Sequence, residues 1–166
     1  MSGSGVEAWK EHTTPFERVQ AIALGVSEPQ SATYIADEAA VSVETARKHL
    51  NSLVELTVVL EHETGNQTKY EPDPLYTWLQ TARDLLDSHN RESLVNLRDE
   101  VQTQIETWRE EYDVDSPDAL REHAADTESA AETREICQIA SDWELTEYRL
   151  NIITDVCSNY SVYNRG

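Results

Sequence analysis

The spacing of hydrophobic positions predicts two short helices in the first half of the chain. Each carries an apolar stripe with the three-to-four-residue spacing of a helix packed on one side. The two stripes are Ile35, Ala36 and Ala39, followed by Ala46, Leu50 and Leu53. Ser42 lies between them, and its hydroxyl suits an N-cap because it can accept a hydrogen bond from a free amide of the first turn. We therefore expect a helix, a tight turn at Val41 and Ser42, and a second helix.

A two-stranded hairpin is predicted directly after these helices. Residues 58–60, Val-Val-Leu, are apolar and mostly β-branched, as is typical of a strand. Residues 64–67, Thr-Gly-Asn-Gln, have the composition of a turn, and residues 68–70 would form the returning strand. The first half of the chain is thus expected to end in a small β-hairpin.

The beginning of the chain holds one strong helix signal. Thr14 at the N-cap, Pro15 at the first helical position and Glu17 at the third form a capping box. The first twelve residues, which include Ser-Gly-Ser-Gly, are expected to be frayed, and residues 27–31 are expected to form a loop.

Pro72 and Pro74 predict a domain boundary, because two prolines cannot lie inside one continuing strand or helix. We expect a first domain of residues 13–72 and an α-helical second domain of residues 73–166. Apolar spacing in the second domain predicts helices that begin near Asp73, Arg91, Ser116 and Ser129. The predicted fold class is therefore mainly α with one small β-hairpin.

The second predicted helix of this domain, residues 91–112, has the seam of a coiled coil. Its apolar positions are three or four residues apart, as in a helix that pairs with another along its length. They are Leu94, Leu97, Val101, Ile105, Trp108 and Tyr112. We take this seam as the first candidate for a homodimer interface and the last helix as the second.

The ordered set of residues in the first domain resembles the winged helix-turn-helix domain of ArsR-like transcription regulators, especially the acidic versions found in halophilic archaea. The residues that carry the resemblance are Ile35, Ala36, Ala39, Val41, Ser42, Thr45, His49, Leu50, Leu53, Val59, Gly65 and Tyr70. The resemblance covers residues 15–71, under half of the chain, and implies a DNA-binding transcription regulator that acts as a dimer. Two features depart from the family: Thr57 stands where relatives usually turn on glycine, and the hairpin, or wing, has a single base, Lys69.

In this reading the second short helix is the recognition helix that enters the major groove of double-stranded DNA. Arg47 can bind guanine through two hydrogen bonds, and Asn51 can do the same for adenine. The remaining candidates on this helix are Ser42, Val43 and Thr45, of which the last two could touch a thymine methyl, and Lys48, which suits a phosphate. The competing interpretation is an ordinary solvated helix face.

The wing supplies a second set of candidate DNA contacts. Its residues Asn66, Gln67, Thr68 and Lys69 could follow a phosphate backbone or enter the minor groove. The competing interpretation is an ordinary polar hairpin tip.

Charge changes what this reading predicts. The chain has a net charge of -19, and residues 33–70 hold six acidic and three basic side chains. DNA affinity usually rests on neutralising phosphates, a contribution that falls steeply with salt. A module this acidic gains little from that contribution, so we expect a shallow or inverted salt dependence, as suits a protein adapted to molar salt. Glu44 and Glu55, which would face a polyanion, favour the alternative of a winged-helix protein–protein interaction module that does not bind DNA.

No residue pattern supports an enzyme, a cofactor or a metal site. The five histidines are scattered, the two cysteines lack the close spacing of a metal site, and no phosphate-binding loop or nucleophile motif occurs. Binding of a small-molecule effector is possible, since Trp78, Trp108 and Trp143 could line a pocket for one, but no residue pattern supports it.

Cysteine usage and the lack of a long apolar run predict a cytoplasmic protein. Cys137 and Cys157 fall on one predicted helix about 30 Å apart, too far to pair with each other, and are expected to be reduced. No apolar run approaches the length of a membrane-spanning helix, and no signal peptide is expected.

Overall fold

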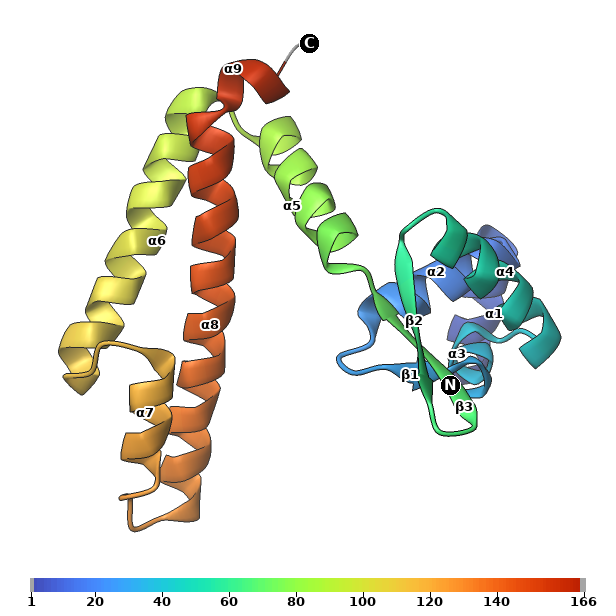
Figure 1. Ribbon diagram of the computed structural model, residues 1–166, viewed down its shortest axis with the longest axis horizontal. Coiled ribbons are helices and arrows are strands. Elements are labelled where there is room, and N and C mark those ends of the chain that lie inside the picture. Colours follow the sequence, from blue (N-terminus) through green and yellow to red (C-terminus); the bar gives the residue numbers. More distant parts are fainter. Residues whose placement is uncertain (1, 165–166) are drawn as a thin grey trace. The chain divides into compact units, whose positions relative to one another are not determined.

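The computed structural model describes residues 2–164 and is mainly helical, with one small three-stranded antiparallel sheet (Figure 1). The chain divides into two compact units, residues 1–79 (unit 1) and residues 80–166 (unit 2). The division falls inside helix α5 (Pro74–Ser88), whereas the sequence places its boundary between residues 72 and 73, just before that helix begins.

Unit 1 begins with two helices, α1 (Ser2–His12) and α2 (Pro15–Gly25). The expectation of a frayed start is therefore wrong, because α1 occupies nearly all of the first twelve residues. The capping box predicted for α2 is confirmed by two hydrogen bonds. The Glu17 amide donates to Thr14 Oγ1 at 3.1 Å, and the Thr14 amide donates to Glu17 Oε2 at 2.9 Å. Both bonds satisfy amides that the helix itself cannot pair.

The rest of unit 1 comprises two further helices and the sheet. These elements are β1 (Gln30–Ser31), α3 (Ala32–Ala39), α4 (Val43–Glu55), β2 (Val59–Thr64) and β3 (Gln67–Pro72). The strands lie in the order β1-β3-β2, and Gly65 takes a left-handed conformation with φ of 65° in the turn between β2 and β3. The predicted hairpin is confirmed. The prediction that residues 27–31 form a loop is wrong for the last two, because Gln30 pairs with Tyr70 and Ser31 pairs with Lys69.

The core of unit 1 is made by the apolar sides of α2, α3 and α4 packed on the base of the hairpin. Its largest fully buried side chains are Val19, Ile35, Leu50, Leu53 and Val59. Arg18 is also buried, and its guanidinium binds two backbone carbonyls. Its Nε donates to the Ala39 oxygen and its Nη1 to the Thr13 oxygen, each at 2.9 Å. This side chain ties α2 to the last turn of α3.

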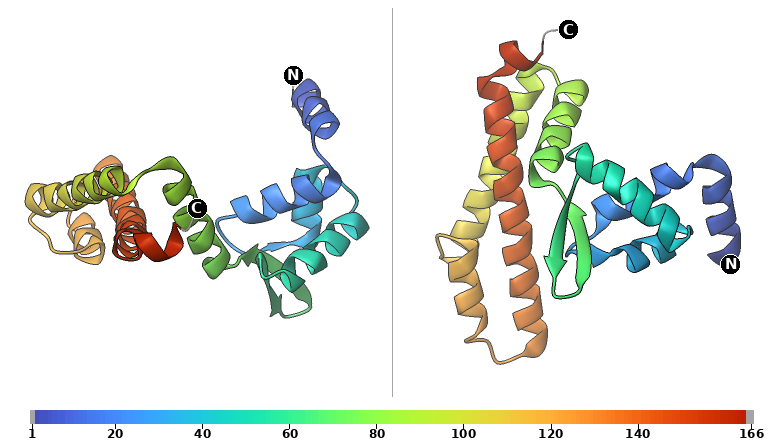
Figure 2. Two further views of the ribbon diagram at one scale, coloured as in Figure 1. Left: turned by 90° about the horizontal axis from the view of Figure 1, so that it is seen from above. Right: turned by 45° about the vertical axis from the view of Figure 1, so that its right-hand side comes forward.

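The helices after α5 are α6 (Arg91–Tyr112), α7 (Pro117–Ala124), α8 (Ala130–Ser158) and α9 (Tyr160–Tyr163), as the sequence pattern predicts for the three longest. Asn90, Ser116 and Ser129 cap α6, α7 and α8 with their side chains. Both α6 and α7 pack along α8 (Figure 2). Trp143 is fully buried at this junction, and its ring stacks on Trp108 with centroids 6.0 Å apart.

The apolar seam of α6 is covered by its own chain. Leu94, Val101 and Ile105 are buried, and Leu97 is half-buried. Trp108 and Tyr112 are half-buried against the cluster that Ile105 forms with Leu120, Ala140 and Trp143. The coiled-coil spacing of α6 is therefore accounted for by packing on α7 and α8, without a second copy of the chain.

Both cysteines lie on α8, as the sequence predicts. Cys137 is half-buried, Cys157 is buried, and neither forms a disulfide. Among the described residues, no helix has both the length and the apolar character needed to cross a lipid bilayer.

Candidate nucleic-acid interface

The turn between α3 and α4 is fixed by backbone conformation and by a side-chain cap. Ala40 ends α3 in a left-handed conformation with φ of 56°, and the Val41 amide donates to the Ala36 oxygen at 3.0 Å. Ser42 then caps α4 as predicted, because the Thr45 amide donates to its Oγ at 3.1 Å. These bonds set the direction in which α4 leaves the turn.

The apolar stripe of α4 determines which of its side chains face solvent. Ala46 and Leu50 are buried in the core of unit 1, so the residues on the opposite side of the helix project outwards. Arg47, Lys48 and Asn51 are accordingly exposed.

A polar hollow of about 300 Å³ lies between α4, the start of α3 and the hairpin, and we call it the α4–hairpin hollow. Five of the ten predicted contact residues line it: Arg47, Asn51, Asn66, Gln67 and Thr68. Two of them come from the helix and three from the turn and strand that follow it. The fold thus brings one helix face and one hairpin edge to a single concave surface.

Three of the other predicted residues have structural roles at the start of α4. The hydroxyl of Ser42, besides capping the helix, donates to Thr45 Oγ1 at 2.8 Å, so both hydroxyl groups are engaged with each other. Val43 packs against the core of unit 1. These side chains stabilise the turn and do not line the hollow.

Both predicted lysines lie outside the hollow. Lys48 is exposed beside it on α4. Lys69 lies on β3 between Thr68 and Tyr70, and successive side chains of a strand point to opposite faces, so Lys69 points away from both neighbours. Arg47 is therefore the single basic side chain among the residues that line the hollow.

Four residues that line the hollow were not among the predicted contact residues: Ser31, Ala32, Thr33 and Tyr70. They reach it because β1 pairs with β3, which joins segments far apart in the chain. For Ser31, the sequence did contain a local signal of its structural role. Ser31 precedes an apolar helix and caps it, since the Tyr34 amide donates to Ser31 Oγ at 3.2 Å.

The hollow differs in charge from the chain as a whole. Its lining contains one arginine, several amides and hydroxyls, and no carboxylate, whereas the chain carries a net charge of -19. Burial raises the pKa of the Tyr70 hydroxyl above its usual value, nearby Glu61 adds to the rise, and Arg47 opposes it. A concave surface of this composition offers many hydrogen-bond donors to an anionic or polar partner.

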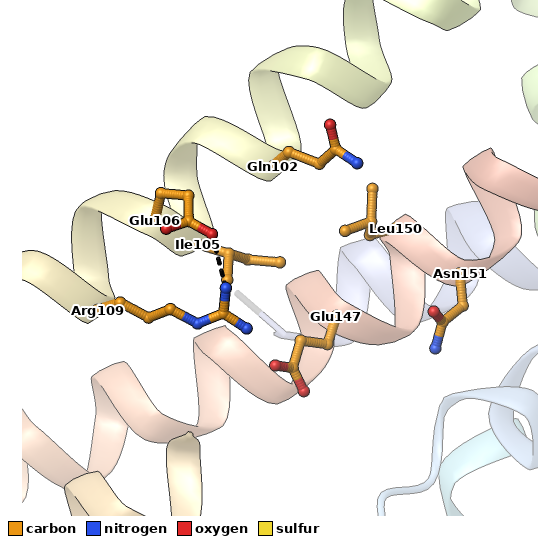
Figure 3. A pocket seen from close by; sticks show the side chains of 7 residues that line it. All are labelled: Gln102, Ile105, Glu106, Arg109, Glu147, Leu150 and Asn151. Carbon is orange, nitrogen blue, oxygen red and sulfur yellow. Dashed lines mark hydrogen bonds and ion pairs between the residues drawn. The ribbon is translucent and has the colours of Figure 1, made fainter. Parts of the chain in front are cut away.

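A second groove, of about 460 Å³, lies between α6 and α8 in unit 2 (Figure 3). Its charged groups are largely matched already. Arg109 Nη1 lies 2.6 Å from Glu106 Oε1, and Glu147 accepts a hydrogen bond from Trp143 Nε1 at 3.0 Å. The tryptophans considered as pocket walls do not line it.

No group of three or more histidine, cysteine, aspartate or glutamate side chains converges on a common point among the described residues. This part of the chain therefore offers no cluster in which protein ligands alone would hold a metal ion.

Comparison with known proteins gives a family and a distant structural likeness. A search of curated proteins gives no match. A solved structure described as that of a transcriptional regulator is similar over 96% of this chain and 92% of that chain, with 14% sequence identity and a TM-score of 0.37. That likeness is too distant to assign an activity. Residues 13–162 match the model of the family of unknown function DUF7342, and the chain therefore belongs to that family.

Proposed function

We propose that the protein is a sequence-specific DNA-binding transcription regulator of a haloarchaeon that acts as a dimer. In this proposal unit 1 is a winged helix-turn-helix, with α3 and α4 as the two helices and the β2–β3 hairpin as the wing. The observation that carries the proposal is the α4–hairpin hollow, in which Arg47 and Asn51 face the same concave surface as the wing. Unit 2 would supply dimerisation, and no catalytic step is involved.

The side chains of the hollow suit the two kinds of contact that a DNA reader makes. Arg47 presents a planar fork of donors that fits guanine O6 and N7, and Asn51 matches the adenine edge in the major groove. Asn66, Gln67 and Thr68 on the wing suit the phosphate backbone, which fixes the register of the protein on the duplex. The hydroxyl of Thr33 at the start of α3 adds a further donor.

The charge of this proposed DNA-binding surface differs from that of a typical, strongly basic DNA-binding domain. With Arg47 as the single base in the hollow, few phosphates are neutralised, so the loss of affinity with salt has a slope of order one in a double-logarithmic plot. Repulsion between DNA and the many acidic groups elsewhere weakens as salt screens it. Affinity should therefore change little, or rise, towards molar potassium chloride. A steep decline with salt would contradict the proposal.

The decisive experiment is binding-site selection from random duplex DNA in molar potassium chloride, followed by footprinting on the selected sequence. Arg47→Ala should lower affinity by about 1–3 kcal/mol and relax selectivity at one base pair. Lys48→Ala is the matched control, because Lys48 is exposed on the same helix outside the hollow and should leave base selectivity unchanged. Failure to enrich any sequence would overturn the proposal. If the Arg47→Ala variant folds and gives the same footprint as the parent protein, Arg47 does not take part in recognising the DNA sequence.

A protein-interaction module is the second candidate, favoured by the acidic side chains around the hollow. Glu44 and Glu55 are exposed on α4, and Glu63 lines a small depression at the hairpin tip. Capture from a cell extract at molar salt separates the two functions. Discrete enriched DNA fragments support the regulator, whereas partner proteins that persist after nuclease treatment, without such fragments, support the interaction module.

A further inference from the structure

Helix α8 has apolar residues on two opposite sides. One side, with Ala140 and Trp143, is buried against α6 and α7. The other side carries Leu145, Tyr148, Ile152 and Val156 at spacings of three and four residues. Its C-terminal half is covered, since Ile152 and Val156 are 0% exposed, whereas Leu145 is 73% and Tyr148 42% exposed. An apolar stripe therefore continues onto the surface in the middle of the helix.

We propose that this exposed stretch, with Ser141, Asp142 and Arg149 beside it, is the surface through which two copies of the chain associate. We call it the outer face of α8. The inference names the dimer surface and so rests on the proposed function for its purpose, although not for its geometry. The two copies of α8 pack antiparallel about a twofold axis at Leu145, which lies next to the midpoint of this 29-residue helix.

Charge on the outer face is complementary to itself in this arrangement. Around the axis, a residue four places after Leu145 meets one four places before it, so Arg149 comes opposite Ser141 of the second copy and beside its Asp142. Arg149 is exposed and has no ion pair or hydrogen bond among residues 2–164. Asp142 uses Oδ1 to accept a hydrogen bond from Gln138 at 3.0 Å, and its Oδ2 has no partner in the part of the chain that the structure describes. Two symmetric Arg149–Asp142 ion pairs would thus flank the central leucine contact.

The other acidic groups of this part of α8 are engaged elsewhere. Glu144 forms an ion pair with Arg121 of α7. Glu147 accepts the Trp143 N–H and lines the groove on the side of α6. The outer face is therefore close to neutral in a chain of net charge -19, so two copies can meet there with little repulsion between charged groups.

Salt should strengthen this association. Two strongly acidic chains repel one another at low ionic strength, and molar salt reduces the screening length to about 3 Å. The contact between leucine and tyrosine side chains does not weaken under these conditions. Dimerisation driven by the outer face is therefore strongest in molar potassium chloride, the opposite of an association held mainly by exposed ion pairs.

The test measures the mass of the full chain by sedimentation equilibrium without DNA, in low and in molar potassium chloride. The parent protein should be dimeric at high salt, and Leu145→Glu should weaken the dimer by at least about tenfold. Val162→Glu is the matched control, because Val162 is also an exposed apolar residue of unit 2 and lies on α9 outside this face. It should leave the dimer intact. Both replaced side chains are exposed, so circular dichroism should show unchanged helix content.

Two further variants test the geometry itself. Arg149→Asp should weaken the dimer, and combining it with Asp142→Arg should restore it, because the exchanged charges meet again across the axis. Leu145→Cys, in a background with Cys137→Ser and Cys157→Ser, should form a disulfide between copies under mild oxidation. A monomer at high salt, or a dimer that Leu145→Glu leaves unchanged, would overturn the inference. DNA binding by a monomer would leave the DNA-binding part of the proposed function standing without this dimer. A dimer that binds no DNA would leave the dimer surface standing without DNA binding.

Discussion

Thr57 occupies a backbone position that favours glycine, and its replacement by glycine should stabilise unit 1. Thr57 follows α4 with φ of 61°. Its amide donates to the Val54 oxygen at 3.0 Å, and the Val58 amide donates to the Leu53 oxygen at 2.9 Å. This pair of bonds is the Schellman arrangement, which requires a left-handed residue at the position of Thr57.

The magnitude follows from two opposing contributions. A left-handed conformation costs a non-glycine residue about 1–2 kcal/mol, and a β-branched side chain makes it less favourable still. Glycine escapes this cost but loses about 0.5–1 kcal/mol more through its greater freedom in the unfolded chain. Thr57→Gly should therefore raise the free energy of unfolding by about 0.5–1 kcal/mol. Thr57 is exposed, so no packing is lost, although its Oγ1 gives up a hydrogen bond to the Leu56 oxygen.

Urea denaturation of the full chain, with native-state hydrogen exchange of the Val58 amide as a local measure, would test this expectation. Thr57→Ala is the matched control, because alanine lacks the hydroxyl and the branch but keeps the Cβ that causes the strain. Thr57→Asn should be intermediate, since asparagine tolerates this conformation better than most residues. A domain of this size gains about 4–8 °C in melting temperature per kcal/mol. If Thr57→Gly is no more stable than Thr57→Ala, backbone strain at this turn is not the quantity that limits stability.

Two further predictions concern buried polar groups of unit 1. Arg18→Met should lower the free energy of unfolding by about 1–3 kcal/mol, because the Ala39 carbonyl that Arg18 binds would stay buried without a partner. The control is Arg47→Met, at an exposed site. It should change the free energy of unfolding by under about 0.5 kcal/mol in the same urea titration. Tyr70 should make the fold less stable at alkaline pH. Its pKa in the folded state is raised above 10.0, so the protonated phenol contributes stability below pH 10.0. This stability is lost as the pH rises from 10.0 through the folded-state pKa. The parent protein should therefore lose more stability than Tyr70→Phe across that range in pH-dependent denaturation, and parallel curves would contradict the assignment.

The starts of α2, α4 and α7 were predictable because their signals are local. Thr14, Ser42 and Ser116 each use a side-chain oxygen to accept a hydrogen bond from an amide three residues later. Such bonds depend only on neighbouring residues, so the sequence is enough to place them. The exposure of Arg47 and Asn51 followed for a similar reason, since helical spacing alone puts them opposite the buried stripe of α4.

Features that depend on pairing between distant segments were not predictable in this way. The two-residue strand β1 has no pattern of its own, and it forms because Gln30 and Ser31 meet β3. The place of Tyr70 in the lining of the hollow was therefore not predicted. The spacing of α6 likewise predicts an apolar side but not the element that covers it. Only the fold shows that Ile105 packs with Ala140 and Trp143 of the same chain.

Under the proposed function, the third strand also limits how the hairpin could respond to a bound duplex. By pairing Ser31 with Lys69, β1 fastens the returning strand to the residue that caps α3, and Arg18 fastens the far end of α3 to α2. The returning strand of the hairpin is thus held through β1 to α3, and α3 is held to α2, whereas the outermost turn lies beyond these contacts. In the proposed complex, a DNA site whose groove width does not fit would have to bend or twist to meet the hairpin. Selectivity would then depend partly on the stiffness of base pairs that no side chain touches.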